Sequence, residues 1–240
     1  MSTIHITIET LIAKRACAPA REEFVTRYPD GIDYQQLLDT IAEDDALPDA
    51  WGSWLLDAFG STNEVRRIDG DLTVKTVFFA GSLEVSGALT TNRGISVGGS
   101  VKAGTSVKAG GSVKAGTFVE AGWSVEAGWS VKAGGSVKAG GSVKAGTFVE
   151  AGWSVKAGTF VEAGWSVKAG GSVKAGGSVE AGGSVEAGTS VKAGTFVKAG
   201  EGYGIFAGLR IRVADWSAYA QVSAKAKPEN LMTGVWMPRT

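Results

Sequence analysis

Residues 131–151 read VKAGGSVKAGGSVKAGTFVEA, and the period of this stretch decides the fold. A valine returns at every sixth residue, followed by Lys or Glu and then by Ala-Gly. The same register runs from Val101 to Val197 in 17 copies, and four earlier aliphatic residues, the first of them Val77, extend it to 21 copies. A fixed short period of this kind is the signature of a repeat architecture.

The period of six favours strands over helices. Side chains alternate along a strand with a period of two, so an even period keeps every valine on one face, whereas a helix would rotate it away. Val and Ala should point inward with Lys or Glu outward between them, and glycine should supply the turn. We therefore predict a mainly β protein, a triangular parallel β-solenoid with about seven coils of 18 residues each.

Two segments without the repeat flank the solenoid, which we expect to span residues 69–208. Residues 1–68 should form an acidic, mostly helical head, because residues 1–100 contain fifteen acidic and eight basic side chains. Residues 209–240 should form a β-rich cap or a dimerisation segment. Apolar patterning places strands at 4–8, 209–213, 219–225 and 231–237, and helices at 21–28, 34–41 and 50–59.

The spacing resembles that of the hexapeptide-repeat β-solenoids, whose left-handed triangular helices have an aliphatic residue at every sixth position. The opening at residues 70–87, GDLTVKTVFFAGSLEVSG, is similar to the polymer-forming bactofilins, whose triangular helix is right-handed. The two resemblances leave the handedness open. The leader, with Ala16-Cys17, Phe24, a YPDG turn at 28–31 and WGSWLL at 51–56, resembles uncharacterised small proteins of phages and mobile elements.

Most catalytic chemistry is excluded by composition. Histidine and cysteine occur once each, as His5 and Cys17, and neither lies in the repeat. Solenoidal acyltransferases need a histidine base, and solenoidal carbonic anhydrases need three imidazoles for zinc. Calcium-binding β-rolls need an aspartate in each repeat, but residues 101–200 have none. We therefore predict no enzyme activity, no cofactor and no metal, and we expect Cys17 to be a small buried thiol.

The outward position between Val and Ala is the first candidate surface. It contains eleven Lys and six Glu in residues 101–200, while the whole chain has a formal net charge of zero. With coils of 18 residues, four consecutive lysines should stack about 4.8 Å apart with no acidic neighbour to neutralise them. This basic stripe, which is either a solvated face or a surface that faces an anion or an acidic partner, consists of Lys138, Lys156, Lys174 and Lys192.

Large aromatic side chains form the second candidate surface. The unit TFVEAGWS occurs at 117–124, 147–154 and 159–166. A core of Val and Ala leaves little room for indoles, so these rings should lie outside, where an apolar patch usually marks a partner or covers itself. The predicted aromatic surface consists of Trp123, Trp129, Trp153, Trp165, Phe118, Phe148 and Phe160.

An acidic patch on the head is the third candidate surface and could contact a basic partner. It consists of Asp30, Asp33, Asp39, Glu43, Asp44, Asp45 and Asp49.

Together these features predict a non-enzymatic interaction protein. The resemblance of the leader implies a phage or mobile-element protein that binds and inhibits a host protein, such as a defence or nucleic-acid enzyme, in an anti-CRISPR-like or other anti-defence role. The alternative is a structural, polymer-forming protein of the bactofilin or fibre type. We expect a homo-oligomer with a dimer favoured, no membrane partner, and nucleic acid only as a less favoured partner. The opening residues lack a basic start and an apolar run, which favours the cytoplasm, that of the host cell if a phage encodes the chain.

Overall fold

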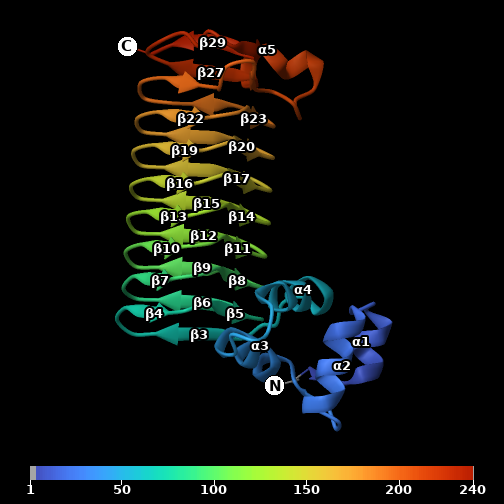
Figure 1. Ribbon diagram of the computed structural model, residues 1–240. Helices are drawn as coiled ribbons and strands as arrows, with labels where there is room; N and C mark the ends of the chain where they lie inside the picture. Colours follow the sequence, from blue (N-terminus) through green and yellow to red (C-terminus); the bar gives the residue numbers. More distant parts are fainter. Residues whose placement is uncertain (1–3, 240) are drawn as a thin grey trace.

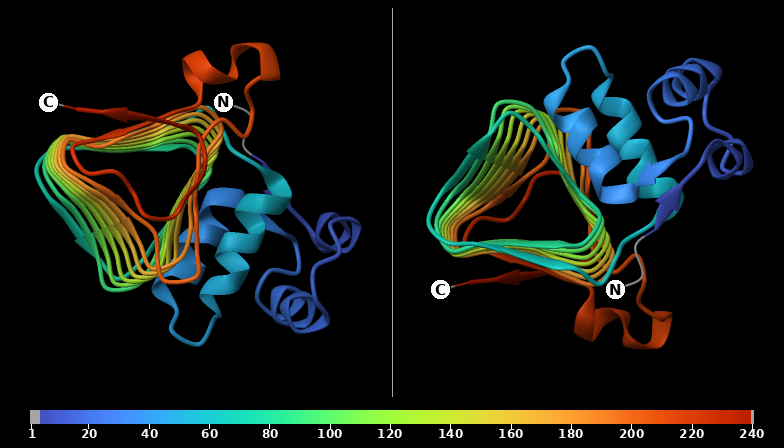
Figure 2. Two further views of the ribbon diagram at one scale, coloured as in Figure 1. Left: turned by 90° about the horizontal axis from the view of Figure 1, so that it is seen from above. Right: turned by 90° about the horizontal axis from the view of Figure 1, so that it is seen from below.

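The valine repeat forms three parallel sheets that wrap around one axis, as expected. The computed structural model, which describes residues 4–239, shows these sheets as the sides of a triangular prism (Figure 1 and Figure 2). Successive strands of the solenoid belong to different sheets. In its regular part each strand pairs in parallel with the strand three places later, whereas two strands near the C-terminus pair with the strand two places later. The pairing joins residues 18 positions apart throughout the regular repeat, such as Val137 and Val155. The prediction of a mainly β parallel solenoid with 18-residue coils is confirmed.

The three sheets are named here by their strand numbers. The ten-stranded sheet contains β3 (Val65–Ile68), β6 (Ser82–Val85), β9 (Val101–Ala103), β12 (Val119–Ala121), β15 (Val137–Ala139), β18 (Val155–Ala157), β21 (Val173–Ala175), β24 (Val191–Lys192), β27 (Gln221–Ala224) and β29 (Val235–Pro238). The eight-stranded sheet contains β4 (Leu72–Val74), β7 (Leu89–Thr91), β10 (Val107–Ala109), β13 (Val125–Ala127), β16 (Val143–Ala145), β19 (Val161–Ala163), β22 (Val179–Ala181) and β25 (Val197–Lys198). The nine-stranded sheet contains β5 (Val77–Phe79), β8 (Ile95–Val97), β11 (Val113–Ala115), β14 (Val131–Ala133), β17 (Phe148–Ala151), β20 (Ser166–Ala169), β23 (Val185–Ala187), β26 (Ile205–Phe206) and β28 (Leu231–Thr233).

The core of the prism is built from the two inward positions of each repeat. The repeat valines from Val101 to Val197 are at most 4% exposed, and the alanines two residues later are buried with them. The corner glycines are required by the close stacking of coils, because a Cβ at Gly152 would collide with the carbonyl oxygen of Gly134 in the preceding coil. A larger residue at this position would therefore push two coils apart.

The predicted number of coils was wrong, since the solenoid has about ten rather than seven. Counting valines missed coils whose strands lack the repeat sequence. The strands β3 and β4 stack before the register begins, and β27, β28 and β29 stack after it ends. Backbone hydrogen bonds between coils do not depend on the side chain, so strands such as VRRI in β3 extend the sheets without a valine.

The C-terminal segment differs from the prediction at its start. Residues 209–213 alternate apolar and basic side chains but form no strand, because Gly208 turns the chain away with a φ of 82° and Ile211 N–H bonds back to its carbonyl oxygen. The chain then passes through the short helix η1 (Val213–Asp215) and α5 (Trp216–Tyr219) outside the prism before it returns as β27 (Figure 2).

The N-terminal head contains four helices and a small two-stranded sheet. These are β1 (His5–Ile6), α1 (Ile8–Ala13), α2 (Ala18–Arg27), β2 (Ile32–Asp33), α3 (Tyr34–Glu43) and α4 (Asp49–Phe59). The helix α1 was not predicted, because the alternation of isoleucines at 4–8 was interpreted as one strand. In the structure Thr7 and Thr10 form a capping box that starts a helix at Ile8.

The head packs against the side of the prism and does not cover its end (Figure 1 and Figure 2). Its core includes Phe78 and Ala80, which flank Phe79 along the chain and face outward from the nine-stranded sheet. At the N-terminal end, β3 and β4 each pair with only one strand of the part of the chain that the structure describes.

Candidate interaction surface

The basic stripe lies on the outer face of the ten-stranded sheet. Strand pairing places Lys138 beside Lys156, Lys156 beside Lys174, and Lys174 beside Lys192 in direct register. The rise from coil to coil is about 4.8 Å, so four ammonium-bearing side chains leave the sheet in one column. All four side chains are exposed.

One end of this column is neutralised, contrary to the expectation that no neighbour would do so. Lys138 Nζ lies 2.6 Å from Glu120 Oε1 in the preceding coil. Lys156 and Lys174 differ from Lys138, because each has a lysine on both sides in its sheet. Lys192 has Lys174 on one side and Ser223 on the other. The stripe is therefore three uncompensated lysines preceded by an ion pair.

The other two faces do not share this arrangement. Cross-coil ion pairs join Lys144 to Glu162 on the eight-stranded sheet at 3.2 Å. Equivalent pairs on the nine-stranded sheet are Lys132 with Glu150 and Lys168 with Glu186. These contacts follow from sequence order, since Lys and Glu occur 18 residues apart on these faces.

Most of the excess positive charge of the repeat thus lies on one face. Within residues 101–200 the outward positions of the ten-stranded sheet hold five lysines and one glutamate, a net charge of +4. The eight-stranded sheet has three of each, for a net charge of zero, and the nine-stranded sheet has three lysines and two glutamates, for +1. Like charges held in register destabilise a sheet, so the column works against folding.

The predicted aromatic residues lie on the corners of the prism and point into solvent. The four tryptophans are 68–74% exposed and the three phenylalanines 36–41%. They do not form one patch, because the chain order divides them among three corners. Phe118 and Trp153 lie between the nine- and ten-stranded sheets, Trp123 and Phe160 between the ten- and eight-stranded sheets, and Trp129, Phe148 and Trp165 between the eight- and nine-stranded sheets.

Two of these corners border the basic face, and one of them forms a groove. Phe118 and Trp153 are two coils apart and enclose a cavity of about 350 Å³ over the small residues Gly135 and Ser136. The ion pair of Glu120 and Lys138 forms another side of this groove. An apolar side chain of a partner could therefore enter beside the lysine column.

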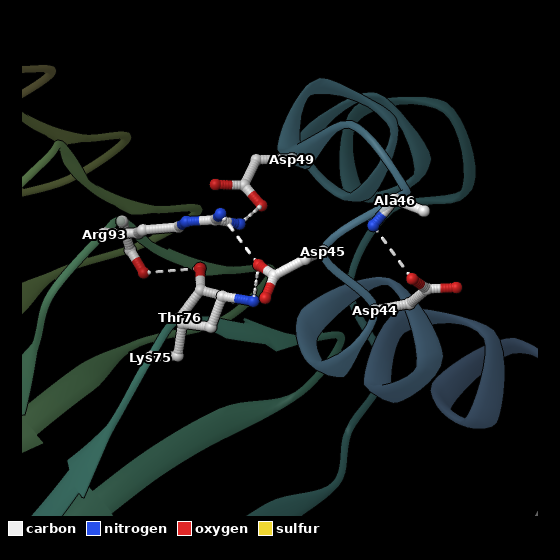
Figure 3. Close-up of polar contacts among 8 residues, drawn as sticks. Asp44, Asp45, Ala46, Asp49, Lys75, Thr76 and Arg93 are labelled. Carbon is white, nitrogen blue, oxygen red and sulfur yellow. Dashed lines mark hydrogen bonds and ion pairs between the residues drawn. The ribbon is translucent and has the colours of Figure 1, made fainter.

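The acidic residues at the end of α3 and the start of α4 face the solenoid. Figure 3 shows Asp45 and Asp49 directed toward Arg93, with Lys75 beside Asp45. Arg93 reaches Asp45 at 2.9 Å and Asp49 at 3.2 Å, and Lys75 also pairs with Asp45. Farther along α4, both carboxylate oxygens of Asp57 lie 2.6 Å from Lys114 Nζ. These carboxylates help to dock the head.

Three further members of the predicted acidic patch are used inside the head. Asp33 accepts hydrogen bonds from the backbone N–H groups of Gln35 and Gln36 and so caps α3. Asp39 accepts one from the Gln35 side chain. Asp44 pairs with Arg27 at 2.7 Å, and this hydrogen bond lowers the pKa of the Asp44 carboxyl.

Only Asp30 and Glu43 of the seven acidic residues are exposed without an ion pair among residues 4–239. Most of these seven carboxylates are therefore not available on the surface of the head to contact a basic partner.

Two residues that sequence reasoning did not single out protect the N-terminal end. The Gln35 side chain donates to the Phe78 carbonyl oxygen at 3.0 Å and accepts from Ala80 N–H at 2.9 Å, as a neighbouring strand would. Arg66 is in register with the buried Leu83, so it faces the prism axis, and its guanidinium carbon lies 4.5 Å from the Phe79 ring centroid. An inward charge on an edge strand blocks pairing with another chain. The charged VRRI sequence of β3 was the available signal.

The remaining residues with reactive or metal-binding side chains do not form a cluster in the part of the chain that the structure describes. Across residues 4–239, no three His, Cys, Asp or Glu side chains lie close enough together to hold a metal ion. Cys17 is exposed at the start of α2, so the prediction of a buried thiol was wrong. Burial raises the pKa of the Tyr34 hydroxyl, which donates to the carbonyl oxygens of Leu55 and Gly60 and is a structural group. None of the helices in residues 4–239 has both the length and the apolar character needed to cross a bilayer.

Comparison of this chain with protein-family models, with curated proteins and with solved structures gives no match.

Proposed function

We propose that this chain is a non-enzymatic binding protein that uses the outer face of its ten-stranded sheet to hold an acidic surface of another protein. The single observation that supports the proposal most strongly is the register of Lys156, Lys174 and Lys192, whose neighbours in the sheet are lysines and one serine, whereas both other faces contain lysine–glutamate ion pairs between coils. The column costs stability in the free protein, and an acidic partner would remove that cost.

The aromatic corners supply the apolar part of the proposed contact. Exposed Trp and Phe side chains beside a charged face are typical anchors of protein interfaces, where a few such residues account for most of the binding energy. Phe118 and Trp153 border the face on one side, and Trp123 and Phe160 on the other. The third aromatic corner lies away from the basic face, and we propose that it supports a homodimer.

A host protein is the proposed target. The resemblance of the leader to phage and mobile-element proteins favours an inhibitor of a host defence or nucleic-acid enzyme, acting in the host cytoplasm. The resemblance of the repeat to hexapeptide-repeat solenoids favours no particular target, because such folds serve many functions.

The test is capture of proteins from a host lysate with two matched variants. Lys156→Gln with Lys174→Gln removes two charges from the ten-stranded face, and Lys144→Gln with Lys168→Gln removes two from the other faces. We expect the first variant to lose the specific partner and the second to retain it. Equal capture by both variants would contradict the proposal.

A structural, polymer-forming role is the second candidate. It is favoured by β3 and β4, each of which has one edge without a partner strand among residues 4–239 and could join another solenoid end to end. The inward Arg66 opposes it. Sedimentation over a range of concentrations separates the two, because a polymer grows with concentration whereas a closed dimer does not.

A further inference from the structure

A cavity of about 510 Å³ lies where the basic face meets the C-terminal segment. After Gly208 the chain leaves the prism at the corner between the nine- and ten-stranded sheets, and α5 stands outside this corner (Figure 2). The space between this excursion and β24 forms the cavity. Lys192, the last lysine of the column, lines this cavity.

Three of the ten residues that line the cavity have positively charged side chains. Lys192, Arg210 and Arg212 line it together with the hydroxyl groups of Ser190 and Tyr219. Asp215 is the one carboxylate among the lining residues. None of the three cationic side chains forms an ion pair in the part of the chain that the structure describes. The residues that line the cavity therefore have a formal net charge of +2.

The position of Arg210 is fixed by the repeat itself. Its backbone N–H bonds to the Gly188 carbonyl oxygen at 2.8 Å, which continues the stacking of coils at this corner. Its side chain lies along the corner glycines, since a Cβ at Gly188 would be 3.1 Å from Cδ and one at Gly170 would be 2.8 Å from Nη1. The glycines therefore leave the space in which the arginine stem lies, which holds part of the site in place before any ligand arrives.

We infer that this cavity binds a phosphate-class oxyanion, a phosphate monoester or inorganic phosphate. Guanidinium and ammonium groups form charge-assisted hydrogen bonds with the several oxygens of a tetrahedral anion, whereas a carboxylate has only two oxygens to offer. Neighbouring hydroxyl groups supply further donors. The inference goes beyond the proposed function, since the site would bind a free anion without the acidic partner.

The first experiment titrates the full chain with inorganic phosphate at constant ionic strength, with chloride as the compensating anion, and follows backbone amide resonances by NMR. We expect saturable shifts confined to residues around 189–192 and 208–221. Arg210→Gln and Arg212→Gln should each weaken binding by about tenfold or more, because each removes charge-assisted hydrogen bonds. Lys156→Gln, which lies on the same face outside the cavity, should leave the affinity unchanged. Shifts that fail to saturate, or equal affinity in the wild type and Arg212→Gln, would overturn the inference.

A second titration distinguishes the source of the phosphate group. Adenosine 5′-monophosphate and phosphoserine are compared with adenosine and serine. Both phosphorylated ligands should bind and both unphosphorylated ligands should not, and the tighter of the two indicates a nucleotide or a phosphorylated protein. Binding of adenosine equal to that of its monophosphate would show that the cavity does not recognise phosphate. The double variant Lys156→Gln with Lys174→Gln tests binding of the acidic partner in a separate experiment. Failure of the phosphate site and failure of the proposed function can therefore be distinguished.

Discussion

At the scale of single residues, the inward and outward positions of the repeat have opposite sensitivities. Val137 is fully buried, so Val137→Asp would place an unpaired carboxylate in a narrow apolar core. We expect this change to destabilise the protein by about 4 kcal/mol or more, or to prevent folding. Thermal unfolding monitored by circular dichroism measures the effect, and an unchanged melting temperature would show that the valine column does not form the core.

A charge reversal at an outward position should instead raise the free energy of unfolding. Lys156→Glu would place a carboxylate between Lys138 and Lys174, where the wild type has three like charges in a row. We expect stability to rise by about 0.2–1 kcal/mol for each opposite-charge pair formed, while partner binding falls. Urea unfolding and binding are measured on the same sample. A variant that is less stable than the wild type would show that the column does not strain the sheet.

The head should become less stable in acid through Asp44. Its hydrogen bond with Arg27 lowers the pKa of the carboxyl in the folded state. The stabilisation is therefore fully present above the unfolded-state value of about 3.9 and is lost as the pH falls through the lower folded-state pKa. Asp44→Asn should melt earlier than the wild type at neutral pH, and the two should converge in strong acid. A constant difference at every pH would contradict this role.

At the scale of the element, the strands were predictable where they repeat, and the apolar patterning at 219–225 and 231–237 also predicted strands where β27, β28 and β29 lie. The six-residue period identified each strand from β9 to β23, because alternation and a glycine corner recur in every copy. The strand β3 has no such pattern and is defined by its pairing with the coil beside it. The excursion at 209–219 was missed because its apolar alternation resembles a strand, whereas Gly208 redirects the chain.

The candidate surfaces were predictable to the same extent. Placement of the lysine column followed directly from the 18-residue coil. The division of the aromatic residues among three corners also follows from that register. The pairing of Asp45 and Asp49 with Arg93 could not be predicted, because it depends on how α4 docks against a distant coil.

The end strand β3 gives a prediction about assembly. Replacing the inward Arg66 with valine would remove the charge from the open end and continue the apolar core to the edge. We expect Arg66→Val to promote end-to-end association, which sedimentation velocity detects as new, larger species. Arg67→Val alters the outward residue of the same strand and should remain like the wild type. If both variants sediment as the wild type does, Arg66 does not prevent end-to-end association.

At the scale of the whole molecule, a neutral chain has a one-sided charge distribution. The formal net charge is zero, yet the ten-stranded face has a net charge of +4 within residues 101–200. Several of the compensating acids lie in the head and pair with Lys75, Arg93 and Lys114 on the solenoid. The head therefore balances charge near its own docking site and leaves the basic face free.

The most direct measurement of the central claim is the reactivity of individual lysines in the complex with the captured partner. Reductive methylation followed by mass spectrometry reports each ammonium group separately. We expect Lys156, Lys174 and Lys192 to be protected when the partner is bound, while Lys108, Lys144 and Lys198 on the eight-stranded face react as in the free protein. Protection of the eight-stranded face, or no protection of the column, would contradict the account of this molecule as a solenoid that binds through its basic face.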